Sequence, residues 1–369
     1  MSEHQEIINS YEEQQGVYLS LEKITSSLIS TLLNNQSLHI HSISSRTKSI
    51  DSLRGKINRP EKNYNSLTDI TDIVGIRITT YFSDELDRVS DLIKAEFDVD
   101  NQNSIDKRKS LEPDRFGYMS LHIIAKHKSM RTTLPEYRQF NGIRFEIQIR
   151  SILQHAWAEI EHDLGYKSEI EIPDVVRRKF SRLSSLLELV DDEFVSIKKT
   201  ISTYIDSLPN KLTSAPTEVT LNIDSLKAFI MTTAEVTALE ESMSTVFNCP
   251  IIDSDSELLS VHLERLKNMN INTIGELSNL YSEYHQDIIP FLTLWLNEES
   301  PSSKNRTAIR HGISLLYITY IHLLNVGNQE LTEKVLRNFI ARDGKDISVR
   351  LNEVWAAYKG NYAANNNVT

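Results

Sequence analysis

One carboxylate stands in a row of polar side chains in residues 142–150, GIRFEIQIR. Polar and apolar residues alternate throughout this segment, and a period of two predicts a strand with one buried face and one polar face. The apolar face is predicted to contain Ile143, Phe145, Ile147 and Ile149, and the polar face Arg144, Glu146, Gln148 and Arg150. The alternative is an amphipathic strand whose polar face is only solvated.

A helix is predicted to follow this strand directly. From Ser151 the apolar spacing becomes helical, which predicts a buried stripe of Ile152, Ala156, Ile160 and Leu164. Beside that stripe fall three titratable residues: His155, Glu159 and His162. They leave a helix-borne metal site and a metallohydrolase open as an alternative. However, the His-Glu-x-x-His spacing of such enzymes is missing, and a metal site would not explain the basic cluster upstream.

That basic cluster occupies residues 46–59, RTKSIDSLRGKINR, in a protein whose net charge is -11. It contains Arg46, Lys48, Arg54, Lys56 and Arg59. If the segment is helical, Arg46 and Lys56 share a side with Ser49, and Lys48 and Ser52 lie next to it. Cations and hydroxyls on one surface suit a polyphosphate. A solvated basic helix is the alternative.

Two more strands are predicted upstream of Glu146. Residues 71–82, TDIVGIRITTYF, have Asp72 at the mouth of a strand, and Gly75 inside it indicates a bulge or a close approach. Asp72 and Arg77 differ in parity, so either Gly75 shifts the register or only one of the two serves the site. In residues 117–127, GYMSLHIIAKH, one face contains Tyr118, Ser120, His122 and Ile124. A helix is predicted over 84–96, and Lys107, Arg108 and Lys109 either contact phosphates or are solvated.

The bulk composition is that of a soluble globular protein of two or three domains, with 369 residues, 40% hydrophobic and 25% charged. No apolar run reaches the roughly 18 residues of a membrane span. The N-terminus lacks the pattern of a secretory signal, so we expect a cytoplasmic protein without a membrane partner. The single cysteine, Cys249, excludes an internal disulfide and a Cys-based metal cluster.

Residues 40–170 resemble the RelA/SpoT-type alarmone synthetases, and in particular their small members with a single synthetase domain. The resemblance rests on RTKSIDSLRGK, DIVGIR, GYMSLH, EIQIR and HAWAEIEHDLGYK, which follow one another in the family's order. It implies an α/β (α+β) nucleotidyltransferase-like domain with a mixed sheet flanked by helices. It also implies an ATP-dependent nucleotide 3′-pyrophosphokinase, which transfers the β,γ-pyrophosphate of ATP to the 3′-hydroxyl of GDP or GTP and releases AMP.

The resemblance further implies a role for each matching residue. Contacts to ATP fall to Arg46, Lys48, Ser52, Lys56 and Arg77. Asp72 and Glu146 are the expected catalytic carboxylates and the ligands of Mg²⁺, the implied cofactor. The acceptor would be bound by Tyr118, which stacks on its base, and by His122, Arg115, Gln148 and Arg150. His155 and Glu161 are weaker candidates for positioning roles.

One departure from the family bears on the acceptor. Guanosine alarmone synthetases commonly have a Lys and an Asn before the Gly-Tyr pair, where this chain has Asp114 and Phe116. A toxin branch of the family acts instead on the 3′-terminal adenosine of tRNA, so that acceptor is the first alternative. An inactive regulatory or binding protein is the second. The stretch before residue 41 is too short for the hydrolase domain of the long members, so no hydrolase activity is expected.

The domain prediction has four parts. Lead-in helices span 1–40, the synthetase domain with its trailing helices spans 41–206, a linker spans 207–220, and a helical domain of unknown function spans 221–369. In small synthetases helices such as 173–206 build homo-oligomers. An antitoxin or regulatory partner is a candidate ligand of the C-terminal domain. Residues 263–280 resemble a helix-hairpin-helix pair, although a plain α-hairpin packed into its own domain is favoured.

Overall fold

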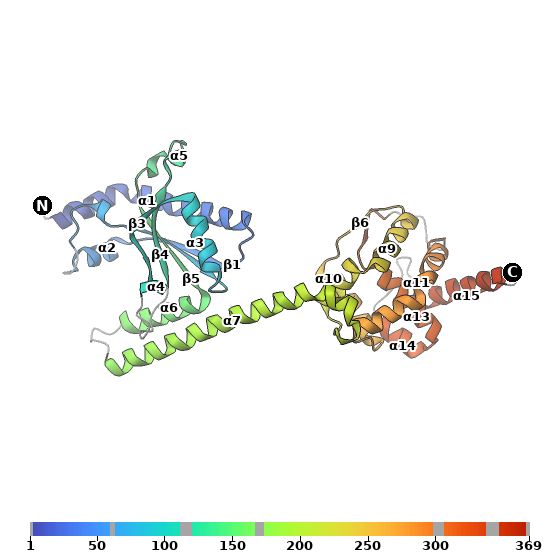
Figure 1. The fold of residues 1–369 in the computed structure, drawn as a ribbon. Helices are drawn as coiled ribbons and strands as arrows, with labels where there is room; N and C mark the ends of the chain where they lie inside the picture. The colour runs from blue at the N-terminus through green and yellow to red at the C-terminus, as the bar shows by residue number, and fades with distance from the viewer. Residues whose placement is uncertain are drawn as a thin grey trace. The chain divides into compact units, whose positions relative to one another are not determined.

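The computed structural model describes residues 3–59, 63–110, 120–166, 173–297, 306–336 and 347–366. The chain divides into two compact units, Met1–Lys199 and Thr200–Thr369 (Figure 1). No helix within the described ranges has the length and apolar content to cross a membrane.

The N-terminal unit is built on a mixed five-stranded sheet of order β1-β2-β5-β4-β3. Its strands are β1 Ile40–Thr47, β2 Val74–Thr80, β3 Phe97–Asp106, β4 Leu121–His127 and β5 Phe145–Ser151. Only the β2/β5 pair is parallel, and the other three pairs are antiparallel. The predicted mixed sheet flanked by helices is therefore confirmed.

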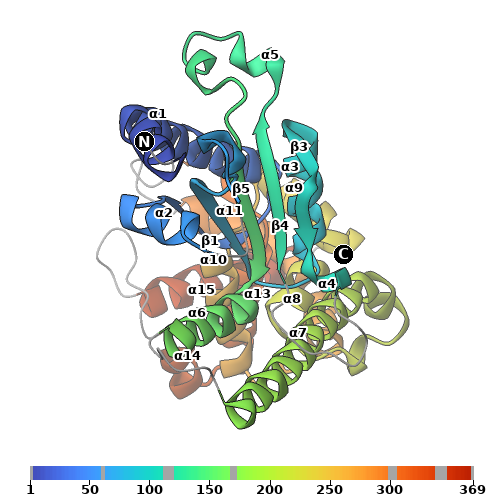
Figure 2. The same cartoon turned by 90° about the vertical axis from the view of Figure 1, so that its left-hand side faces the viewer.

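Helices and short 3-10 turns connect these strands (Figure 2). They are α1 Glu3–Asn35, α2 Ile50–Ile57, η1 Leu67–Asp69, α3 Glu85–Glu96, α4 Lys107–Ser110, α5 Ser129–Thr132 and η2 Arg138–Phe140. α1 and α3 pack against the sheet and touch each other. The core they cover contains Ile76, Ile78, Ile123, Phe145 and Ile147, all at most 1% exposed. The opposite parity of each strand therefore forms the polar face, as the period of two predicts.

α6 Ile152–Tyr166 follows β5 without a loop, as predicted, but it buries a different side. Ile160 is 56% and Leu164 59% exposed, whereas Gln154 and Trp157 are buried. Gln154 is held by hydrogen bonds with Ser151 at the start of the helix, and Trp157 packs edge-on against Phe180. The predicted buried stripe is therefore wrong, because these tertiary contacts turn the apolar stripe away from the unit.

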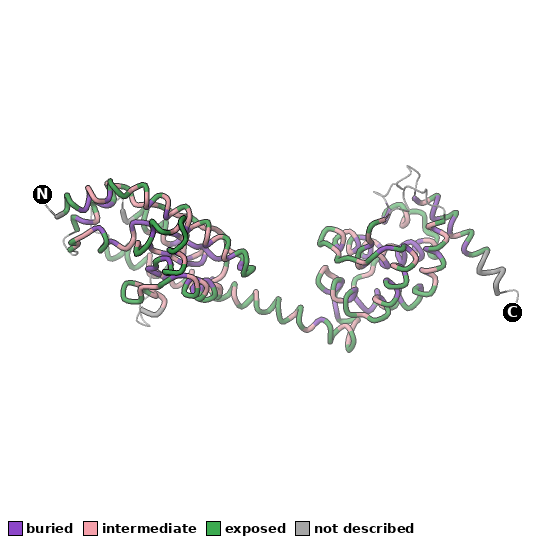
Figure 3. The backbone as a smooth tube through the Cα atoms, turned by 90° about the horizontal axis from the view of Figure 1, so that it is seen from above, coloured by how far each residue is buried: buried purple, intermediate pink, exposed green. Residues whose placement is uncertain are grey.

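α7 Asp174–Ser214 packs on the N-terminal unit through polar residues. Asp191 accepts a hydrogen bond from Ser151 at 2.6 Å, and the Lys198 ammonium lies 3.2 Å from carboxylate oxygens of Asp84 and Glu85. Much of the helix is exposed or half-buried (Figure 3). Five of the residues that are at least 40% exposed are separated by seven, four, three and four positions, which fits the heptad repeat of a coiled-coil seam: Leu183, Val190, Phe194, Ile197 and Ile201.

The stretch 207–220 is not the extended linker that its prolines and hydroxyl residues suggest. α7 continues through it to Ser214 with Pro209 inside the helix, and η3 Pro216–Glu218 follows. Leu208 is fully buried in the core of the C-terminal unit, and Leu212 packs against the same core. This burial outweighs the helix-breaking tendency of Pro209.

The C-terminal unit is helical, with one short parallel strand pair, β6 Ile251–Ile252 and β7 Ile309–Arg310. Its helices are α8 Ile223–Thr232, α9 Ala234–Phe247, α10 Ser256–Asn268, α11 Ile274–Asn297, α13 Ile313–Val326, α14 Gln329–Leu336 and α15 Ile347–Asn366. The hairpin between α10 and α11 packs against η3, since a Cβ on Gly275 would lie 2.6 Å from Thr217 Cγ2. The glycine of the turn therefore serves packing, which supports the α-hairpin alternative.

Candidate active site

The sheet register brings the predicted site residues into two neighbouring rows on the polar face. Arg46 of β1 pairs with Gly75 of β2, and Gly75 pairs with Glu146 of β5. In the next row Arg77 pairs with Gln148, and Gln148 pairs with His122 of β4. Because paired residues point to the same side of a sheet, the polar side chains of four strands converge there.

A pocket of about 150 Å³ lies over these rows, and its walls include Arg46, Asp72, Arg77, Glu146, Gln148 and Glu159. A Cβ on Gly75 would lie 4.0 Å from Arg46 Cγ, which is an ordinary contact distance, so the close approach expected at Gly75 is not found among the described residues. The register of β2 against β5 has no shift at Gly75, which excludes the bulge considered from the sequence. Asp72 precedes β2, so the alternation of side chains between the two faces of a strand does not fix its direction. It can therefore reach the same pocket as Arg77.

Asp72 is held between two lysines. Its Oδ2 lies 2.6 Å from Lys56 Nζ of α2 and 3.4 Å from Lys48 Nζ. Burial raises the pKa of Asp72, but Lys48 and Lys56 together outweigh burial, so the pKa lies below its ordinary value. Burial lowers the pKa of Lys48, and Asp72 offsets part of this shift. A paired carboxylate and two cations therefore border the pocket.

Ser52 lies exposed in the first turn of α2, where its hydroxyl accepts a hydrogen bond from Ser49 at 2.9 Å. Ser49 is the N-cap of α2. Hydroxyls and backbone N–H groups at a helix N-terminus favour anions. The cations and hydroxyls are thus present on β1, α2 and the segment between them, but not on one helix as supposed from the sequence, because α2 begins only at Ile50.

Glu146 is the centre of a hydrogen-bonded chain. Its Oε1 lies 2.7 Å from His122 Nδ1, and its Oε2 accepts a hydrogen bond of 2.9 Å from Gln148. Arg150 in turn donates to Gln148 Oε1 at 2.6 Å, and His122 Nε2 lies 2.7 Å from Ser120 Oγ. Burial raises the pKa of Glu146, but the interactions with His122 and Gln148 lower it by more than burial raises it. The net pKa lies below its ordinary value, so the carboxyl group is ionised at neutral pH.

Two polar atoms of this pocket are buried without a hydrogen-bond partner among the described residues, Asp72 Oδ1 and Arg77 Nε. Buried polar groups are normally paired, so these two are candidates for ligand contacts. No group of three His, Cys, Asp or Glu side chains in the described part of the chain could hold a metal ion. Mg²⁺ is commonly bound by one or two carboxylates together with substrate phosphates, so Asp72 and Glu146 fit that ion.

Arg77 has an acidic partner that sequence reasoning did not identify. Its Nη1 lies 2.8 Å from Glu159 Oε1 of α6. Glu159 had been considered only with His155 and His162 as a metal site, which the described residues do not form. Burial, then the charges of Arg150 and Arg77, lower the pKa of His155. The direct passage from β5 into α6, which is visible in the sequence, was the signal that places Glu159 above the sheet.

Other predicted residues lie elsewhere. Tyr118 and Arg115, together with Asp114 and Phe116, fall outside the described residues. Arg108 is bound by two carboxylates, with Asp87 at 2.7 Å and Asp106 at 2.9 Å, and these hydrogen bonds raise its pKa further. Arg108 is therefore already neutralised and is a poor candidate for a phosphate contact.

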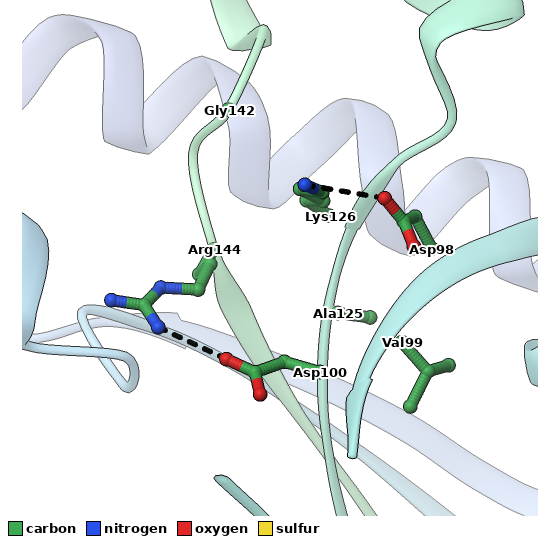
Figure 4. Close-up of a pocket in the computed structure, with 7 residues that line it drawn as sticks. All are labelled: Asp98, Val99, Asp100, Ala125, Lys126, Gly142 and Arg144. Atoms are coloured by element: carbon green, nitrogen blue, oxygen red, sulfur yellow. Dashed lines mark hydrogen bonds and ion pairs between the residues drawn. The ribbon is translucent and has the colours of Figure 1, made fainter. Parts of the chain in front are cut away.

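A second pocket, of about 350 Å³, is larger but has a different character (Figure 4). Its charged residues cancel in pairs, with Arg144 3.0 Å from Asp100 and Lys126 3.2 Å from Asp98. Asp100 also accepts hydrogen bonds from the backbone N–H groups of Gln102 and Asn103. These groups hold the turn within β3, so the smaller pocket with its unpaired atoms is the better candidate site.

Known proteins resemble the part of the chain that contains this pocket. Residues 45–171 match the family model of the region found in RelA/SpoT proteins. The N-terminal unit therefore contains a region similar to the one found in RelA/SpoT proteins. The chain is similar to two Bacillus subtilis (strain 168) proteins, GTP pyrophosphokinase YjbM and GTP pyrophosphokinase YwaC. Each is 29% identical, over 43% of this chain and 72% of YjbM, and over 42% of this chain and 73% of YwaC.

Among solved structures, the chain is similar to that of small alarmone synthetase 1 from Bacillus subtilis, with a TM-score of 0.45 and 24% identity. That alignment covers 53% of this chain and 99% of the other. The RelA/SpoT match contains every residue assigned above to the pocket. It ends before α7, so the C-terminal unit lies outside the matched region.

Proposed function

We propose that this protein is a pyrophosphokinase that transfers the β,γ-pyrophosphate of ATP to the 3′-hydroxyl of GDP or GTP and releases AMP. The observation that carries the proposal is the convergence of Arg46, Asp72, Arg77 and Glu146 on one pocket. Transfer of a pyrophosphoryl group depends mainly on positioning and on neutralising the charge of the phosphates. The pocket has the side chains for both tasks.

The roles follow from the contacts. Arg46 and Arg77 line the pocket, and Lys48 and Lys56 are paired with Asp72 in its wall, so these four cations bind ATP. The 3′-oxygen of the acceptor attacks the β-phosphorus, and the bond from that phosphorus to the α,β-bridging oxygen breaks, so the electron pair leaves with AMP. Glu146 accepts the proton of the 3′-hydroxyl, since its carboxyl group is ionised at neutral pH. His122 and Gln148 hold that carboxylate in place.

Asp72 and Glu146 are the residues that would hold Mg²⁺, which neutralises phosphate charge when it is bound. The buried Asp72 Oδ1, which has no partner among the described side chains and backbone groups, supports this assignment. Asp72 is ionised at neutral pH, because its pKa lies below the ordinary value. It is therefore in the protonation state that a hard cation requires.

The test is a transfer assay with purified protein, Mg²⁺ and γ-labelled ATP. GDP, GTP, ATP and deacylated tRNA are supplied as acceptors in separate reactions. We expect the label on GDP and GTP, with an equal amount of AMP. Label on tRNA alone would reject the guanosine acceptor and support the second candidate function, a toxin that modifies the 3′-terminal adenosine of tRNA and stops translation.

That second candidate is favoured by one sequence feature, the Asp114 and Phe116 that stand where guanosine-specific relatives commonly have Lys and Asn. Both candidates use the same pocket and the same Glu146, so they differ only in the acceptor. A protein without activity would not require the two site carboxylates. Label on no acceptor, with an unchanged phenotype for Glu146→Gln in cells, would support an inactive regulatory protein.

We also propose that α7 joins copies of this chain into a homo-oligomer. Its polar residues are used within the N-terminal unit, while its outward residues Val190, Ile197 and Ile201 are each at least 40% exposed. A seam with a repeat of 3.5 residues is suited to pack against another helix. A second copy of α7 provides a helix with the same repeat.

A further inference from the structure

Within the described residues, the candidate active site is smaller than pockets that usually hold a nucleotide. Its volume is about 150 Å³, whereas pockets that bind small molecules and cofactors measure roughly 300–1,000 Å³. Most of its wall is fixed, because Arg46, Arg77, Glu146 and Gln148 lie on the strands of one sheet. Glu159 comes from α6 instead, and its side chain is 55% exposed. It is therefore the wall residue that can swing away at the smallest cost.

Glu159 also occupies the guanidinium of Arg77. The two groups are 2.8 Å apart, which is hydrogen-bond distance for an ion pair. A carboxylate and a phosphate present similar acceptor oxygens to a guanidinium, so the pair competes with a nucleotide phosphate for Arg77. The buried Arg77 Nε, which has no partner among the described residues, shows that this ion pair does not use all the donors of the side chain.

The other two carboxylates of the pocket have partners of their own. Asp72 is paired with Lys48 and Lys56, and Glu146 with His122 and Gln148. Glu159 is paired with Arg77, and its other neighbour is His155, whose Nδ1 lies 3.8 Å away. The pKa of His155 is lowered. When a polyanion enters, Glu159 is thus a negative charge that opposes it and that no second full cation balances.

We propose that Glu159 is a latch, and that its ion pair with Arg77 keeps the nucleotide pocket closed until ATP displaces it. This inference rests on the proposed function and names a residue that limits ATP binding without taking part in the transfer. The opposite possibility is that Glu159 contacts the substrate. The two possibilities predict changes of opposite sign when the charge is removed.

The test is the variant Glu159→Gln, which keeps the size and helical propensity of the side chain. Binding of an ATP analogue with a methylene group between the α- and β-phosphates is measured by calorimetry without an acceptor. A partly exposed ion pair changes an equilibrium by about twofold to fivefold, so we expect Kd to fall by about that factor. The KM for ATP should fall in parallel, with kcat within about twofold of the parent because the transfer step is unchanged.

The matched control is Asp91→Asn on α3, which removes the same charge from an exposed ion pair with Lys94. It should leave Kd and KM unchanged. Equal or weaker analogue binding by Glu159→Gln, in a parent protein that transfers pyrophosphate, would overturn the latch and leave the proposed function intact. If neither protein binds the analogue and the parent transfers no pyrophosphate, both proposals fail.

Discussion

Replacing Glu146 with Gln separates catalysis from folding. The Glu146 carboxylate lies 2.7 Å from His122 Nδ1 and accepts a hydrogen bond of 2.9 Å from Gln148. A glutamine has the same shape, and its amide oxygen can still accept from Gln148. Its amide nitrogen can then donate to His122 Nδ1 if the proton of that ring moves to Nε2, which donates to Ser120 at 2.7 Å. Both hydrogen bonds therefore survive in neutral form.

The expected cost in stability is moderate. Hydrogen bonds to a charged group contribute about 1.5–3 kcal/mol and neutral ones about 0.5–1.5 kcal/mol, so the change at two bonds should cost about 2–3 kcal/mol. The expected cost in activity is larger. A carboxylate that accepts a proton in the transition state contributes about 10²- to 10⁴-fold, and an amide cannot replace it. We therefore expect kcat to fall by at least about 100-fold.

The activity is measured as transfer of labelled pyrophosphate at saturating ATP and acceptor, and folding as the thermal unfolding midpoint. The pKa of Glu146 in the parent lies below its ordinary value, so this group is already ionised above about pH 6 and the parent activity should not depend on its titration there. The variant has no group that ionises in its place, so raising the pH should not restore its activity. A Glu146→Gln protein that keeps its unfolding midpoint and more than about a tenth of the parent kcat would refute the assignment of Glu146 as the catalytic base.

Three further predictions concern the fold. Burial, and then the charge of Arg131, lower the pKa of His127 to about 4. The free energy of unfolding of the N-terminal unit should therefore be highest above pH 6.5 and fall by up to about 3 kcal/mol as the pH drops from 6.5 to 4. Denaturant unfolding at several pH values checks this, and His127→Gln should flatten the dependence. Glu240 is fully buried and accepts hydrogen bonds from Gly312 and Ser314, so Glu240→Gln should cost the C-terminal unit about 2–4 kcal/mol in thermal unfolding. Val190→Glu on α7 should convert an oligomer to monomers in light scattering, and a monomeric parent would contradict the seam.

The strands and their polar face could be predicted from the sequence, because a period of two depends on local geometry alone. Phe145 and Ile147 are fully buried, and Glu146 and Gln148 lie on the other face, as the alternation predicts. The row of side chains across three strands could not be predicted in this way. It depends on the strand order and register, and these depend on contacts far apart in the sequence.

The helical predictions failed where packing outweighs periodicity. The apolar spacing of Ile160 and Leu164 is correct for an amphipathic helix, but the unit buries Trp157 and Gln154 instead. Pro209 is a helix breaker by propensity, yet the burial of Leu208 keeps it inside α7. An apolar stripe in the sequence predicts that a face needs a partner, and it does not say whether that partner belongs to the same unit.

The electrostatics of the pocket support the proposal that a nucleotide and a cation bind together. Asp72 Oδ1 is an acceptor and Arg77 Nε a donor, and both are buried without partners among the described residues. An unsatisfied buried polar group costs about 1–3 kcal/mol, so a ligand that satisfies both recovers that energy on binding. A phosphate alone would satisfy the donor and oppose Asp72, while a cation alone would satisfy Asp72 and oppose Lys48 and Lys56. Only a polyphosphate bound with a divalent cation satisfies both atoms and balances the charges around them.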